Sequence, residues 1–136
     1  TMVLNGALAG LVSITAEPLT PGLGAATLIG GIGGFIVVFA VPLLDRFKID
    51  DVVGAIPVHL IAGIWGTLAV VITNPDATLM AQLTGIVVIG LFTFIVSLIV
   101  WMILAKTIGI RVSEEAEVAG LDNSELGMDS YPEFSR

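Results

Sequence analysis

The sequence contains no cysteine, and this absence excludes disulfide bonds and thiolate metal sites. It contains a single histidine, His59, so an imidazole metal site would lack partners. Only five residues are lysine or arginine and they form no basic patch, which argues against nucleic-acid binding. Charged residues make up 12% of the chain, about half the share of a soluble domain. We therefore expect no metal, no other cofactor and no soluble globular fold.

Long apolar runs fill most of the chain instead. The residues are 56% hydrophobic, and the mean hydropathy is +1.04. Segments with the Pro, Asp or Asn content of turns separate four runs, at 2–16, 23–44, 52–72 and 79–106. The first run is shorter than the roughly 20 residues that a membrane-spanning helix needs, so it spans only if it is tilted or if its beginning is missing. The pattern predicts an all-α membrane protein with four transmembrane helices in residues 1–106.

Charge predicts the orientation of these helices. All five basic residues lie in the segment between runs two and three or after run four, at Arg46, Lys48, Lys106, Arg111 and Arg136. The segments 17–22 and 73–78 carry none. Because basic residues gather on the cytoplasmic side of a membrane, we expect residues 107–136 to form a cytoplasmic tail. Seven of the twelve acidic residues also lie in this tail.

Small residues at helical spacing predict close packing of runs two and three. Gly30 and Gly34 form a GxxxG pattern, and one face of run three carries the stripe Ala55, His59, Gly63 and Gly66. Such stripes let helix backbones approach one another, so both runs should lie inside a bundle. Run four has large apolar residues round much of its circumference, which favours a peripheral position. Asn5 and Thr15 on the first run are polar at membrane depth and are weaker hints.

His59 is the leading candidate for function. It lies eight residues after Asp51, about 12 Å along a helix, and half of a hydrocarbon core is about 15 Å thick. Ionisable side chains near the bilayer midplane usually mark a pathway or a relay. Burial favours the neutral imidazole, in which one nitrogen donates and the other accepts a hydrogen bond. Pro57 lacks an N–H group and can distort the helix beside the ring. The alternative is a histidine that only bonds a neighbouring helix.

Asp50 and Asp51 stand at the start of the same run. Acidic side chains at a helix N-terminus complement the macrodipole and cap free N–H groups. We expect this structural role for both.

Three stretches together resemble the ammonium transporter family (Amt/Mep/Rh). The segment DDVVGAIPVHLIAGIWGTLAV at 50–70 is similar to the family signature D-D-x-x-x-x-x-x-V-H-x-x-x-G-x-x-G. NGALAGLVSITA at 5–16 resembles its element N-G-x-L-A-G-L-V-x-I-T-A, and 109–134 resembles its cytoplasmic tail, G-L-R-V-x-x-E-x-E-x-x-G-L-D. The three occur in the family's order and are spread along the chain from residue 5 to residue 134.

The resemblance implies a transporter rather than an enzyme. It implies an eleven-helix fold with an inverted repeat, of which the four runs would be helices eight to eleven, and a homotrimer with one pore per subunit. His59 would be the second of two pore histidines, with Ala55 bordering the same conduit. Ammonium would be recruited outside, deprotonated and moved as ammonia, with separate transfer of the proton. The first histidine falls in a part of the family fold that this sequence does not contain, so a complete pore needs further helices.

The resemblance also assigns a role to the tail. Glu117, Gly120, Leu121 and Asp122 match the segment that packs under a neighbouring subunit, and PII-type signal proteins bind this cytoplasmic face in many members. Leu126 departs from the family pattern, which often has histidine there. Two alternatives remain open at this stage: a non-conducting assembly or PII-binding regulatory fragment, and an ammonium sensor that signals through the tail.

Overall fold

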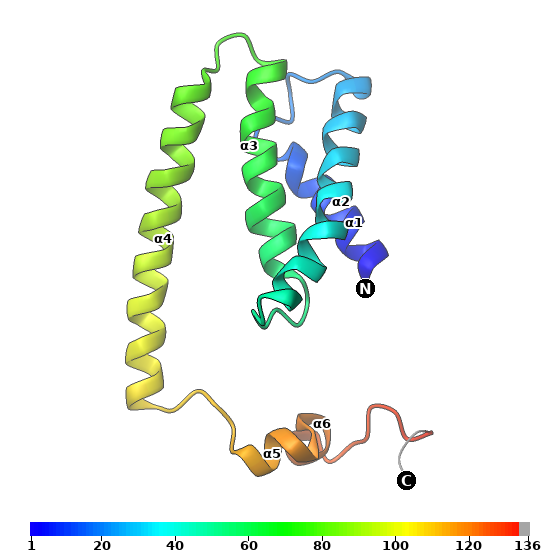
Figure 1. Ribbon diagram of the computed structural model, residues 1–136, viewed down its shortest axis with the longest axis vertical. Coiled ribbons are helices and arrows are strands. Elements are labelled where there is room, and N and C mark those ends of the chain that lie inside the picture. The colour runs from blue at the N-terminus through cyan, green and yellow to red at the C-terminus, as the bar shows by residue number, and fades with distance from the viewer. Residues whose placement is uncertain (134–136) are drawn as a thin grey trace. The chain divides into compact units, whose positions relative to one another are not determined.

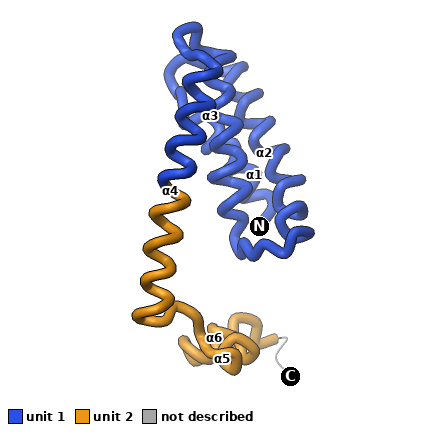
Figure 2. The backbone as a smooth tube through the Cα atoms, turned by 60° about the vertical axis from the view of Figure 1, so that its left-hand side comes forward, with its two compact units in different colours: residues 1–92 blue, residues 93–136 orange. Residues whose placement is uncertain are grey.

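The computed structural model describes residues 1–133, in which every regular element is helical. The chain divides into two compact units, residues 1–92 and 93–136 (Figure 2). The first unit holds α1 (Met2–Ile14), α2 (Leu23–Arg46), the π-helical turn η1 (Ile56–Ile61) and α3 (Ala62–Thr73). The long helix α4 (Leu79–Thr107) extends from the first unit into the second, which also contains α5 (Glu114–Ala119) and α6 (Leu121–Leu126).

Three stretches of helix are long and apolar enough to cross a membrane: Leu23–Arg46, Ile56–Thr73 and Leu79–Thr107. Helix α1 is also apolar but has only 13 residues. The prediction of an all-α membrane protein is therefore confirmed; three helices have the length of a span, and the count of four transmembrane helices stays a prediction. The short first run remains a short helix because Thr15 and the turn after it end α1 before Pro18.

Close contacts between glycines bring α1 against α2 (Figure 1). A Cβ atom added at Gly10 would lie 3.2 Å from the carbonyl oxygen of Gly30, and one added at Gly34 would lie 3.0 Å from that of Gly6. The predicted GxxxG face of α2 thus packs directly on α1. Where these helices meet η1 and α3, a small core forms from Ala9, Val37, Val58 and Ala62.

Two polar side chains join the helices of the first unit. The buried hydroxyl of Ser13 donates to the carbonyl oxygen of Ala9 at 2.7 Å and lies 3.4 Å from that of Ala62. The indole Nε1 of Trp65 donates to the carbonyl oxygen of Ile29 at 3.0 Å. These bonds link α1 and α2 to the helix that carries His59.

The start of the third run differs from the prediction. Apolar residues begin at Val52, but Val52 and Val53 form a turn and Gly54 has a φ angle of +77°. The helix begins only after this turn, with Ile56 as the first residue of η1. Hydropathy misses this boundary because the turn is as apolar as the helix.

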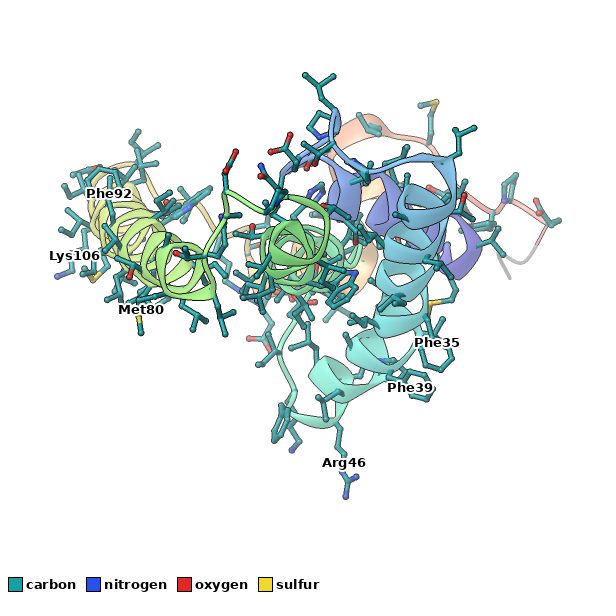
Figure 3. All side chains as sticks on the ribbon, turned by 90° about the horizontal axis from the view of Figure 1, so that it is seen from above. Phe35, Phe39, Arg46, Met80, Phe92 and Lys106 are labelled. Atoms are coloured by element: carbon teal, nitrogen blue, oxygen red, sulfur yellow. The ribbon has the colours of Figure 1, made fainter. Side chains whose placement is uncertain are left out.

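Helix α4 has 29 residues and no buried side chain within this chain. Viewed from above, its side chains extend all round the helix, among them Met80, Phe92 and Lys106 (Figure 3). The helix ends at Thr107, one residue after the predicted end of the fourth run.

Candidate functional site

A hollow of about 260 Å³ lies beside His59. One wall comes from the first two turns of α1, and the other comes from the turn before η1 and from η1 itself. The lining is mostly apolar, with polar side chains contributed by Thr1, Asn5 and His59; the apolar part comprises Leu4, Leu8, Val53, Gly54, Ala55 and Val58. The structure thus brings together His59 and Ala55, both predicted from the sequence, with the N-terminal end of α1.

The backbone around His59 is a π-helical turn rather than a regular α-helix. Its hydrogen bonds span five residues, as in the bond from the N–H of Ala62 to the carbonyl oxygen of Pro57. Ala55 and His59 are both exposed on the hollow, whereas Gly66 is buried against α1. The predicted stripe therefore packs as expected at Gly66 but not at its first two positions, which line the hollow.

Asp51 caps the start of this turn. Its Oδ1 accepts a hydrogen bond from the backbone N–H of Ala55 at 2.8 Å, and its Oδ2 accepts one from that of Ile56 at 2.7 Å. Asp50 is exposed and takes no part in the cap. The two neighbouring acids, which the sequence treats alike, therefore have different places in the structure.

Gly54 and Asn5 form a contact that sequence reasoning missed. A Cβ atom at Gly54 would lie 2.5 Å from the Nδ2 atom of Asn5, and the φ angle of +77° at Gly54 also favours glycine. The glycine therefore lets the Asn5 amide reach the edge of the hollow. The available signal was the polar Asn5 in an apolar run, which shows neither its partner nor its direction.

No three histidine or acidic side chains in residues 1–133 come close enough to hold a metal ion. The hollow offers hydrogen bonding at the imidazole of His59, the amide of Asn5 and the hydroxyl of Thr1, on an otherwise apolar surface.

The predicted tail residues lie together around the α5–α6 junction. Nη2 of Arg111 lies 2.8 Å from each carboxylate oxygen of Glu117, and both side chains are largely exposed. Gly120, with a φ angle of +91°, separates α5 from α6, and Leu121 follows it with an exposed side chain. Oδ2 of Asp122 accepts a hydrogen bond from the N–H of Ser130 at 2.8 Å, and bonding to Ser130 holds the pKa of Asp122 below its ordinary value.

Comparison with known proteins gives a consistent result. The model of the Ammonium Transporter Family matches residues 1–131. An ammonium transporter of Haloferax mediterranei, Amt1, is 42% identical over 136 aligned residues, which cover 96% of this chain and 26% of the relative. Amt2, an ammonium transporter of Archaeoglobus fulgidus, is 39% identical, with 98% of this chain and 33% of the relative covered.

The chain spans about a third or less of the length of these relatives. The range matched by the family model, residues 1–131, includes the hollow, the π-helical turn and both tail helices. By sequence and by its apolar helices, this chain belongs to the Ammonium Transporter Family.

Proposed function

We propose that this chain is the C-terminal part of an ammonium transporter and that His59 lines the path of the transported species. The observation that carries the proposal is the placement of the only histidine on an apolar hollow, in a chain of this family. Ala55, one turn earlier, borders the same path. The relatives that are named ammonium transporters support the substrate.

The chemistry of the hollow favours a neutral solute. An ammonium ion that enters an apolar space loses its hydration, which costs several kcal/mol or more for an unpaired charge. Ammonia avoids this cost and still needs a hydrogen-bonding partner. A neutral imidazole supplies one donor and one acceptor, and it can also take up a proton. His59 can therefore guide ammonia and exchange protons within a surface that excludes the cation.

The remaining wall of the path comes from the rest of the transporter. The imidazole of His59 is exposed in this chain, and the chain has no second histidine to pair with it. An eleven-helix subunit would place further helices, including the first pore histidine, against this open side. We further propose the homotrimeric assembly that the family resemblance implies, with one such path in each subunit.

The tail lies on the cytoplasmic side under this proposal. Basic residues at 46–48 and 106–111 support the orientation, since both segments then lie inside. The protein would be a multi-pass protein of the cell membrane. The segment from Glu117 to Asp122 would contact a neighbouring subunit, and a PII-type signal protein would bind the same face.

The test is ammonium-evoked current in proteoliposomes that contain the complete transporter of which this chain is part. Replacing His59 with leucine should leave the fold nearly intact, because an apolar side chain suits the site, and should abolish or alter the current. Leu60→Ala is the matched control, because Leu60 is also exposed on the same turn but does not line the hollow. Unchanged current and selectivity in His59→Leu would contradict the pathway role.

The same assay on this chain alone addresses the alternative of a non-conducting assembly or regulatory fragment. We expect no current from the isolated chain, because one side of the hollow is open. A saturable current that disappears in His59→Leu would instead show that copies of the chain build a pore together.

A further inference from the structure

The π-helical turn at Ile56–Ile61 is the single stretch of π-helix in residues 1–133. Such turns are rare, and they often occur at functional sites because the extra residue changes the direction of neighbouring side chains. Here the turn contains His59 itself. What holds the turn in place therefore also determines where the imidazole points.

The turn is held at both ends. At its start, the two carboxylate oxygens of Asp51 accept the backbone N–H groups of Ala55 and Ile56, at 2.8 and 2.7 Å. At its end, Val58 and Ala62 are 2% and 0% exposed in the small core against α1 and α2. The core fixes the position of the helix, and Asp51 fixes where its first turn begins.

The wide turn explains which residues face the hollow. One row of buried residues in this segment recurs every four residues, at Gly54, Val58, Ala62 and Gly66, and Pro57 is buried beside it. On a regular α-helix, a step of four residues rotates the side chain by about 40°, so such a row would drift round the helix. A π turn has more than four residues per turn, so a step of four falls short of a full turn and offsets the drift of the neighbouring α-helical steps. Ala55 and His59 therefore both line the hollow as exposed residues, while Val58, which also lines it, is 2% exposed and belongs to the core.

We propose that Asp51 is a positioning residue: by holding the first N–H groups of the π-helical turn, its carboxylate directs the His59 ring into the hollow. The effect of Asp51 on the direction of the ring does not depend on the proposed function, whereas its consequence for transport rests on that function. Asp51 acts through the backbone and does not touch the path, since it is absent from the lining of the hollow.

The absence of native cysteine allows a direct test by cross-linking in the purified chain. One variant pairs Leu8→Cys with His59→Cys, two positions that line the hollow from opposite walls. A second pairs Leu8→Cys with Leu60→Cys, which lies outside the hollow. With Asp51 present, a short bifunctional thiol reagent should link the first pair in preference to the second. In Asp51→Ala the cross-linking preference should fall by about five-fold. This factor corresponds to the free energy of about 1 kcal/mol that a protein typically loses with a helix cap.

Two further variants make the test specific. Asp50→Ala removes the same charge one residue earlier and should leave the preference unchanged, because Asp50 is not in the cap. Asp51→Asn keeps one carbonyl oxygen as an acceptor and should give an intermediate cross-linking preference. If Asp51→Ala does not fold, this variant tests the proposal instead. Amide exchange at Ala55 and Ile56 should quicken in parallel. An unchanged preference in a folded Asp51 variant would overturn the proposal.

Transport measurements separate this inference from the proposed function. In the complete transporter, Asp51→Ala should alter the pH profile of ammonium current, with partial recovery in Asp51→Asn. If the cross-linking preference shifts while His59→Leu leaves transport unchanged, the positioning role stands and the pathway role fails. If the preference holds while His59→Leu abolishes transport, the pathway role stands and Asp51 is not a positioning residue.

Discussion

Individual glycines, which have no side chain, determine how closely the helices of the first unit approach one another. The backbone of Ser13 lies in the space that a side chain at position 66 would occupy. The hydroxyl of Ser13 lies in the space that a side chain at position 33 would occupy. Each glycine thus makes room for a specific atom of α1. Other glycines of the same helices, such as Gly31, have open space around them. The sequence does not distinguish these two kinds of glycine, because the difference lies in a neighbouring helix.

Gly66→Ala should destabilise the chain. The added Cβ would lie 2.5 Å from the carbonyl oxygen of Ser13 and 2.9 Å from its carbonyl carbon, both backbone atoms that move only with α1. We expect a loss of about 1–3 kcal/mol, measured by thermal unfolding of the purified chain in detergent. Gly31→Ala is the control, because its Cβ would meet nothing within 4 Å. Equal melting temperatures for the two variants would contradict the packing described.

Ala55→Leu should reduce transport without unfolding the protein. Ala55 is exposed on the hollow, so a larger side chain narrows the path without crowding the core. The complete transporter should show a lower maximal ammonium current, while thermal unfolding stays within about 0.5 kcal/mol, as at other exposed positions. Ala81→Leu, an exposed change on α4, should alter neither quantity. Full current in Ala55→Leu would remove Ala55 from the path.

At the scale of elements, side-chain hydrogen bonds at the helix ends stabilise short helices that helix propensity alone would not. Helices α5 and α6 have six residues each, fewer than an isolated helix needs for stability in water. Ser113 caps α5 by accepting the N–H of Ala116 at 3.3 Å, and Asp122 fastens the segment after α6 through Ser130. The tail fold therefore depends on a few polar contacts.

Acidification should release the contact between Asp122 and Ser130. Hydrogen bonds from Ser130 lower the pKa of Asp122 in the folded tail, so the contact stabilises the fold above the ordinary value of 3.8. This stabilisation is lost as the pH falls through the lowered pKa of the folded state. The amide resonance of Ser130 should follow this transition in an NMR titration. Asp122→Ala should show the released resonance already at neutral pH, and a resonance insensitive to both changes would contradict the contact.

At the scale of the whole molecule, hydropathy and charge together predict how the chain crosses the membrane. The three long apolar helices supply the spans, and the segments that connect them alternate between those with and those without basic residues. Because lipid offers no partner for backbone groups, each span must satisfy its own hydrogen bonds as a helix. The order of the spans along the chain then determines which connecting segments lie on the same side of the membrane.

Cysteine labelling should confirm this arrangement in sealed vesicles, since the chain has no native cysteine. Phe47→Cys and Asn123→Cys should react with an impermeant thiol reagent from the cytoplasmic side, because their segments carry or adjoin the basic residues. Asp76→Cys should react from the opposite side. Labelling of Phe47→Cys and Asp76→Cys from the same side would show that Ile56–Thr73 does not cross the membrane.

The sequence by itself determined the helical membrane class and the family, and it singled out His59 as the candidate for function. Each depends on residue type and local spacing: apolar runs of sufficient length, three motifs in order, and one histidine in an apolar helix. These properties are visible along the chain because lipid imposes the same requirement on every residue of a span.

Only the tertiary structure decided that His59 lines the hollow and that Asp51 caps the turn that carries it. The π-helical turn, the unequal roles of Asp50 and Asp51, and the space that Gly54 leaves for Asn5 all depend on contacts between distant segments. Ser13 and Ala62, whose contact joins two of the helices, are 49 residues apart in the chain. Hydropathy and helical periodicity describe one helix at a time, whereas the direction of a side chain at a helix junction depends on the neighbour against which the helix packs.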